Sequence, residues 1–287
     1  MSALSAFDGT KLAYDELGTG GDPVVCLPGG PMQASQYLGD LGGLSEKRRL
    51  IRLDLRGTGD SAVPEDLGSY RCDRLVDDVE ALRRHLALDR MDLLAHSAGA
   101  NLALLYAVRH PGRVRKLALV APSLMATGIS VSATDRREVA HLRTGEEWFP
   151  EASAALARVA ADGGSAQDWE RLTPFFYGRW DAAARAHKAS EASGRNHEAA
   201  AIFGSEGAFD AHAVREALAD FRSPTLILAG ELDVNSPPSR AAELAEIFPN
   251  AELVVQPGSA HFPWLDDADR FVATTRAFLA DPGAERD

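Results

Sequence analysis

The chain has 287 residues, of which 45% are hydrophobic, and carries a formal net charge of −12 at pH 7. This length can bury a large core, and the acidic charge argues against nucleic acid or an anionic membrane surface as a partner. No apolar run approaches the roughly 18 residues that a membrane span needs, and no secretory signal pattern opens the sequence, so we expect a cytoplasmic protein.

The first part of the chain alternates strand patterns with glycine-rich loops. Residues 4–7 and 11–17, separated by a turn at Asp8 and Gly9, predict an antiparallel hairpin. Continuous apolar runs at 24–27 and 49–53 predict strands that are buried on both faces. The runs end at glycine-containing loops, and apolar positions on one helical face then predict a helix over 73–88.

The next strand pattern, 91–96, ends in the sequence Ala95-His96-Ser97-Ala98-Gly99, and an apolar helix pattern follows at once. A serine between small residues at a strand-to-helix turn has strained backbone angles, and its hydroxyl projects from the end of the sheet. Ser97 is therefore the candidate nucleophile. His96 is expected to pack beneath the turn.

After a strand at 114–120, the pattern becomes helical over 123–222, with apolar spacing around 151–161, 169–180, 182–192 and 211–221. Strand patterns return at 225–230 and 251–255, and helices are predicted at 238–248 and 267–279. We expect a core domain made of 1–122 and 223–287, a helical cap at 123–222, and a frayed tail at 281–287.

Three polar residues follow predicted strands in the order Ser97, Asp233, His261. A serine hydroxyl becomes a good nucleophile when a neutral imidazole takes its proton, and a carboxylate on the other ring nitrogen fixes the tautomer and stabilises the resulting cation. This order of nucleophile, acid and base is that of the α/β-hydrolases.

The whole chain resembles an α/β-hydrolase, which implies about eight mostly parallel strands with an inserted helical cap. Within that superfamily it is most similar to the proline iminopeptidases. The similarity lies in Gly-Gly-Pro at 29–31, the loop 54–61, Gly230-Glu231-Leu232-Asp233 and His261-Phe262-Pro263. The chain differs from their usual motifs at 28, 32, 95, 96 and 98. The resemblance implies an oxyanion hole made by the backbone N–H groups of Gly30 and Ala98.

The resemblance also implies a substrate site in the cap. Iminopeptidases bind the free amino terminus of a peptide with cap carboxylates, for which Glu191, Glu198 and Glu206 are the candidates. Aromatic cap residues, among them Trp180 and Phe203, are candidates for an apolar pocket. Asp54, Arg56 and Ser61 are expected to hold their loop rather than to react.

We therefore expect a serine hydrolase that needs no cofactor and no metal and acts on a small molecule or a short peptide. Proline iminopeptidase-like aminopeptidase activity is the first hypothesis, and carboxylesterase, lactonase or thioesterase activity on a small apolar substrate, such as a biosynthetic intermediate, is the alternative. A hypothesis of another class is a ligand-binding homologue without turnover. Cys26 and Cys72 lack metal-ligand spacing and are expected to be buried thiols. The sequence leaves open whether the protein forms a homo-oligomer.

Overall fold

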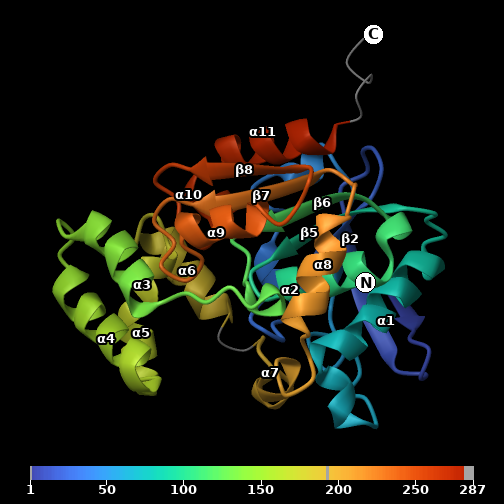
Figure 1. Cartoon of the computed structure of the whole chain (residues 1–287), viewed down its shortest axis with the longest axis horizontal. Coiled ribbons are helices and arrows are strands. Elements are labelled where there is room, and N and C mark those ends of the chain that lie inside the picture. The colour runs from blue at the N-terminus through green and yellow to red at the C-terminus, as the bar shows by residue number, and fades with distance from the viewer. Residues whose placement is uncertain (1, 192–193, 281–287) are drawn as a thin grey trace.

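The computed structural model describes residues 2–191 and 194–280, except for the side chain of Glu191. The tail at 281–287 that we predicted to be frayed lies outside these residues. An eight-stranded sheet with the order β1-β2-β4-β3-β5-β6-β7-β8 forms the centre of the molecule (Figure 1). Its strands are β1 (Ser2–Ser5), β2 (Lys11–Leu17), β3 (Val24–Leu27), β4 (Leu50–Leu53), β5 (Met91–His96), β6 (Val114–Val120), β7 (Thr225–Gly230) and β8 (Ala251–Gln256).

Most of the sheet is parallel, as predicted. Strands β1 and β2 form the expected antiparallel hairpin, and β2 also pairs antiparallel with β4. From β4 to β8 every neighbouring pair is parallel. Strands β3, β4, β5 and β7 are buried along their whole length, which explains why apolar residues dominate them. The buried charges Arg52 of β4 and Asp92 of β5 are each held in an ion pair. Since parallel strands end at the same edge, the loops after β3, β5, β7 and β8 lie close together.

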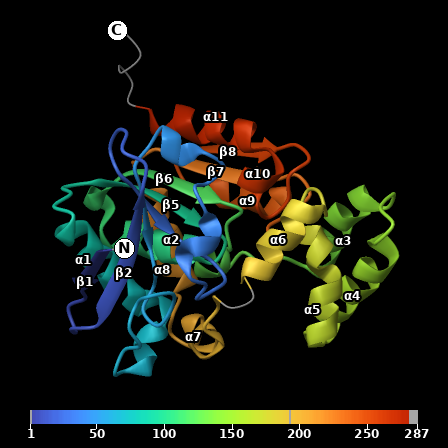
Figure 2. The ribbon, with the colours of Figure 1, turned by 180° about the vertical axis from the view of Figure 1, so that it is seen from behind.

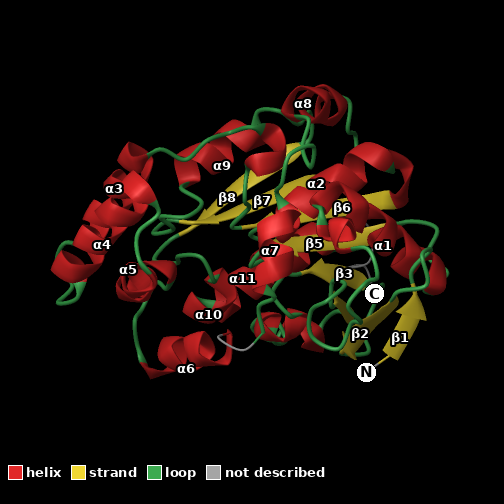
Figure 3. Ribbon diagram, turned by 90° about the horizontal axis from the view of Figure 1, so that it is seen from below, coloured by secondary structure: helices red, strands yellow, loops and turns green. Residues whose placement is uncertain are grey.

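Helices cover both faces of the sheet, which lies between two helical layers in Figure 3. The larger hydrophobic core involves α1 (Cys72–His85), α2 (Gly99–Arg109), α8 (Ala211–Ala219) and α9 (Pro238–Ala245). On the opposite face lie the short 3-10 helix η1 (Ser35–Leu38), α10 (Pro263–Asp266) and α11 (Ala268–Leu279). Cys26 and Cys72 are buried free thiols.

The segment predicted as a cap contains α3 (Ala133–Ala140), α4 (Phe149–Asp162), α5 (Ala166–Leu172), α6 (Ala182–Glu191), α7 (His197–Phe203) and α8. Helices α3 to α6 extend beyond the sheet, on the left in Figure 1 and on the right in Figure 2. Residues of α3, α4 and α5 form a small hydrophobic cluster with Phe175 and with Val234 of the loop after β7. Ala184 of α6 packs instead in the cluster that includes residues of η1, α10 and α11. Helix α8 packs against the main core through Val214 and Leu218 instead. The boundaries of the cap stay a prediction.

The structure differs from the helix predicted at 169–180. Helix α5 ends at Leu172, a 3-10 turn spans Thr173–Phe176, and Tyr177 is extended. Pro174 accounts for the break, because it has no N–H with which to continue the backbone hydrogen bonds of α5. None of the helices in the described part of the chain is long and apolar enough to cross a membrane.

Candidate active site

Strand β5 ends in a tight turn that presents Ser97. The φ angle of Ser97 is +51°, in the left-handed region that a residue with a side chain rarely adopts. Gly99 allows the turn, because a Cβ there would lie 2.5 Å from the carbonyl oxygen of Pro28. Ala95 is completely buried before the turn. The small residues on both sides of Ser97 therefore have a steric reason, as the motif predicts.

The turn brings Ser97 to the two other residues predicted at strand ends. Its Oγ lies 2.9 Å from Nε2 of His261, and Nδ1 of the same ring lies 2.8 Å from Oδ2 of Asp233. A carboxylate can only accept, so Nδ1 carries the proton and Nε2 can accept the serine proton. The three side chains thus have the geometry of a nucleophile, a general base and an orienting acid.

The Asp233 side chain is held rigidly in this arrangement. It is fully buried, and its second oxygen, Oδ1, accepts hydrogen bonds from the backbone N–H groups of Asn235 (2.8 Å) and Ser236 (3.1 Å). Buried carboxylates need such donors to offset the loss of hydration. The carboxylate is therefore fixed in position by backbone donors as well as by its contact with His261.

The loop after β3 lies directly against the serine. A Cβ at Gly29 would stand 2.8 Å from Cβ of Ser97 and 3.2 Å from the nitrogen of Ala98. Gly30 has a φ of +110°, which favours glycine, and is followed by a cis peptide bond to Pro31. Within the described residues, the N–H groups of Gly30 and Ala98 have no hydrogen-bond acceptor. Both donors are thus available to a substrate oxygen.

Segments of the predicted cap contact the loops that carry the acid and the base. Arg136 on α3 donates to the carbonyl oxygen of Val234, which follows Asp233 (2.8 Å). The N–H of His261 donates to the carbonyl oxygen of Phe176 (3.0 Å), and the two rings lie 5.9 Å apart. The periodicity of this segment suggested a continuous helix and gave no indication that Phe176 meets the base.

A half-buried carboxylate adds to these contacts. Asp266 accepts from the N–H groups of Ala260 and Gly178, both at 2.8 Å, and so joins the base loop to the predicted cap. Burial raises the pKa of Asp266 to about 6, against the opposing effect of these backbone donors.

The loop 54–61 has a structural role in this site, as predicted. Asp54 accepts from the N–H of Ser35 (2.8 Å), and the hydroxyl of Ser61 accepts from the N–H of Ala13 (2.8 Å). Arg56 forms a buried ion pair with Asp78 of α1. These contacts fix the loop to its neighbours.

The structure does not bring the five predicted substrate residues together. Glu198 and Glu206 are exposed to solvent, and the side chain of Glu191 lies outside the described residues. Phe203 is completely buried in the main core with neighbours on α7 and α8. Trp180 is half-buried, with Arg185 over its ring. Their roles in substrate binding stay predictions.

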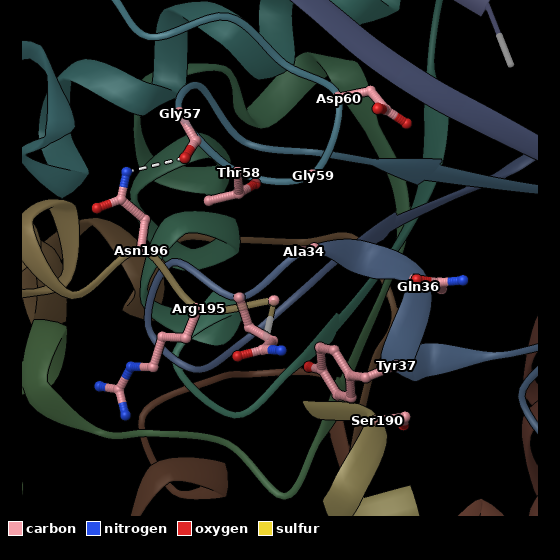
Figure 4. Close-up of a pocket in the computed structure, with 12 residues that line it drawn as sticks. Ala34, Gln36, Tyr37, Gly57, Thr58, Gly59, Asp60, Ser190, Arg195 and Asn196 are labelled. Atoms are coloured by element: carbon pink, nitrogen blue, oxygen red, sulfur yellow. Dashed lines mark hydrogen bonds between the residues drawn. The ribbon is translucent and has the colours of Figure 1, made fainter. Parts of the chain in front are cut away.

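A polar groove of about 640 Å³ lies beside the loop after β3. Its lining includes Gln33. Figure 4 labels other lining residues, among them Tyr37, Gly57 to Asp60, Arg195 and Asn196. The Asn196 amide closes one end by donating to the carbonyl oxygen of Gly57 (2.8 Å). Ser97 and His261 do not line this groove. Gln33 lies next to Gly30, so the groove borders the outer side of the same loop.

Over residues 2–191 and 194–280, no group of three or more His, Cys, Asp or Glu side chains is arranged to hold a metal ion. The absence of a metal or cofactor requirement stays a prediction.

The fold is that of a known class of hydrolases. The family model for the alpha/beta hydrolase fold matches residues 22–268, and the chain belongs to this family. The fold and the enzyme class predicted from the sequence are thus confirmed.

Relatives and solved structures point to more than one activity. The chain is 26% identical over 280 residues to a proline iminopeptidase from Heyndrickxia coagulans, covering 93% of each protein. It is 29% identical over 260 residues to a 2-hydroxymuconate semialdehyde hydrolase from Pseudomonas putida, covering 90% of this chain and 84% of that protein. An esterase from Rhodococcus sp. ECU1013 is similar in structure, with a TM-score of 0.68, 26% identity and coverage of 97% and 98%. A thermophilic esterase from Thermogutta terrifontis, 24% identical with a TM-score of 0.72, shares the fold over 97% of this chain and 98% of its own.

Proposed function

We propose that the protein is a serine hydrolase that cleaves an amide or ester through an acyl-enzyme. The observation that carries this proposal is the unbroken series of contacts from Ser97 through His261 to Asp233, at 2.9 and 2.8 Å. His261 takes the proton of Ser97 as the hydroxyl oxygen attacks the substrate carbonyl. It then gives that proton to the leaving group, and a water molecule repeats the sequence to release the acid.

The N–H groups of Gly30 and Ala98 are the proposed oxyanion hole. They are backbone groups that belong to adjoining segments, since a Cβ at Gly29 would touch both Ser97 and Ala98. Donors fixed in this way need no reorganisation as charge develops on the substrate oxygen, and losing one typically costs about 10² to 10³ in rate.

The first substrate proposal is a peptide or amide with a small apolar amino-terminal residue, proline foremost. Similarity to proline iminopeptidases over 93% of the chain supports it. An ester of a small apolar acid is the second candidate, because Glu198 and Glu206 are exposed. An exposed carboxylate stays hydrated and binds an ammonium group weakly. The proposal also includes the helical cap at 123–222, a cytoplasmic location and no cofactor.

The test compares proline p-nitroanilide with p-nitrophenyl butyrate, using wild type and Ser97→Ala. We expect Ser97→Ala to abolish turnover and labelling by a fluorophosphonate probe, while the melting temperature stays within a few degrees. If the wild type cleaves the anilide and blocking its amino group abolishes this activity, the result supports an aminopeptidase. If the wild type cleaves only the ester, the result supports an esterase. A folded wild type that is neither active nor labelled would instead indicate a ligand-binding homologue.

A further inference from the structure

A series of buried hydrogen bonds connects the loop after β3 to the loop that carries His261. The N–H of Gly29 donates to the hydroxyl oxygen of Tyr37 (2.7 Å), and that hydroxyl lies 2.7 Å from Nδ1 of His96. Nε2 of His96 lies 2.8 Å from the carbonyl oxygen of His261. All four residues are buried, and they come from four separate segments.

The direction of each hydrogen bond follows from the chemistry of the groups. The carbonyl oxygen of His261 can only accept, so Nε2 of His96 carries a proton. Burial lowers the pKa of His96 well below its ordinary value, and the neighbouring His261 adds to this effect, so the ring stays neutral. Nδ1 of His96 therefore accepts from the hydroxyl of Tyr37, whose oxygen accepts in turn from Gly29.

The rings that carry these bonds are held by their neighbours. The centroid of His96 lies 5.6 Å from that of Tyr37, 4.8 Å from Trp264 and 4.8 Å from His261. Close packing of this kind leaves little room for another rotamer. The packing therefore keeps the rings of Tyr37 and His96 in place, and the hydrogen bond between them keeps a defined direction.

Three residues of the series are, or directly precede, proposed catalytic groups. His96 immediately precedes Ser97, and Gly29 immediately precedes Gly30, whose N–H is a proposed oxyanion donor. The carbonyl group bound by His96 belongs to His261 itself. The nucleophile turn, the oxyanion loop and the base loop are thus connected through one tyrosine hydroxyl.

We propose that Tyr37 and His96 are positioning residues that hold the oxyanion loop and the general base in place relative to Ser97. This inference rests on the proposed hydrolase function. A displacement of about 1 Å in a catalytic group can cost on the order of 10²-fold in rate, so positioning residues of this kind affect turnover without touching the substrate.

A second set of contacts holds the backbone of Tyr37, so the effect of its hydroxyl can be tested separately. The backbone carbonyl of Tyr37 accepts from Nε2 of His187 on α6 (3.1 Å), and Nδ1 of His187 accepts from the hydroxyl of Tyr177 (2.9 Å). These contacts hold the backbone of Tyr37 without using its hydroxyl. Tyr37→Phe therefore removes the hydroxyl and keeps the ring and its backbone anchor.

The experiment measures kcat, KM and fluorophosphonate labelling for Tyr37→Phe, His96→Phe and the double variant. We expect kcat to fall about 10- to 100-fold in Tyr37→Phe with KM within about twofold, because the site is misaligned and not blocked. The double variant should lose little more than the worse single variant, since both act through one series of bonds. Tyr14→Phe is the matched control, because Tyr14 is also buried and its hydroxyl contacts a histidine, His85, at 3.2 Å. It should leave kcat unchanged.

A Tyr37→Phe variant that keeps kcat within twofold of wild type, or losses that simply multiply in the double variant, would overturn the inference. Failure of the proposed function is distinguishable, because the wild type itself would then show neither activity nor labelling. In that case the downfield imidazole N–H proton resonances decide the inference. They should shift for both His96 and His261 in Tyr37→Phe and not in Tyr14→Phe, and unshifted resonances in Tyr37→Phe would refute the connection.

Discussion

Asp233→Asn is the substitution whose effect the structure defines most sharply. The backbone N–H groups of Asn235 and Ser236 donate to Oδ1 of Asp233, and an amide oxygen can accept both. The amide nitrogen of the new residue must then face Nδ1 of His261. An NH₂ group donates, so Nδ1 must accept and the ring proton moves to Nε2.

A proton on Nε2 prevents His261 from taking the proton of Ser97. Reversal of the tautomer with the geometry intact costs about 10⁴ in kcat in a serine protease with the same three groups. We expect a loss of that order here, which corresponds to about 5 kcal/mol of activation free energy. The fold should be largely unaffected, because both backbone hydrogen bonds to Asp233 are kept.

The assay measures three quantities for wild type and Asp233→Asn. They are kcat on whichever of proline p-nitroanilide and p-nitrophenyl butyrate the wild type cleaves faster, the rate at which the fluorophosphonate probe labels Ser97, and the melting temperature. Asp92→Asn serves as the control, because Asp92 is equally buried and its carboxylate pairs with Arg115 at 2.7 Å. It should lower the melting temperature and leave kcat unchanged. A kcat for Asp233→Asn within tenfold of wild type would refute the assigned acid.

Two further predictions follow from the loops around the site. Gly29→Ala should lower kcat by at least about 100-fold, because its Cβ would lie 2.8 Å from both the carbonyl oxygen of His96 and Cβ of Ser97. Gly112→Ala, where a Cβ meets no atom within 4 Å, should not change kcat, and an equal effect of the two would contradict this reasoning. The second prediction concerns Asp266, whose pKa burial raises to about 6 from 3.8. The folded state favours the protonated carboxyl, so this group stabilises the fold below about pH 4 and loses that contribution as the pH rises to 6. The stability of wild type relative to Asp266→Asn should therefore fall by up to about 3 kcal/mol over this range in urea unfolding. A pH-independent difference would contradict the raised pKa.

Three hydrogen-bond contacts connect the predicted cap to the loops of the proposed catalytic groups. Phe176 and Gly178 meet the base loop through His261 and Asp266, and Arg136 meets the acid loop. A substrate that displaces this segment would therefore disturb the base directly.

Much of the fold and the three proposed catalytic residues could be predicted from local sequence. Continuous apolar runs mark strands buried on both faces, and the small residues around Ser97 mark a turn in which larger side chains would clash. Asp233 and His261 follow strands that the sequence pattern also predicts, and the parallel arrangement brings strand ends to one edge. Each of these signals depends on residues that are close together in the chain, so it can be recognised from the sequence.

Only the tertiary structure decided where the remaining side chains lie. Phe203 is part of the core and Glu198 is exposed, although the resemblance to proline iminopeptidases makes both candidates for a substrate site. The contact from Tyr37 to His96 spans 59 residues, and that from His96 to His261 spans 165. No local periodicity records a hydrogen bond between such distant segments, because it exists only when the sheet has assembled and brought their loops together.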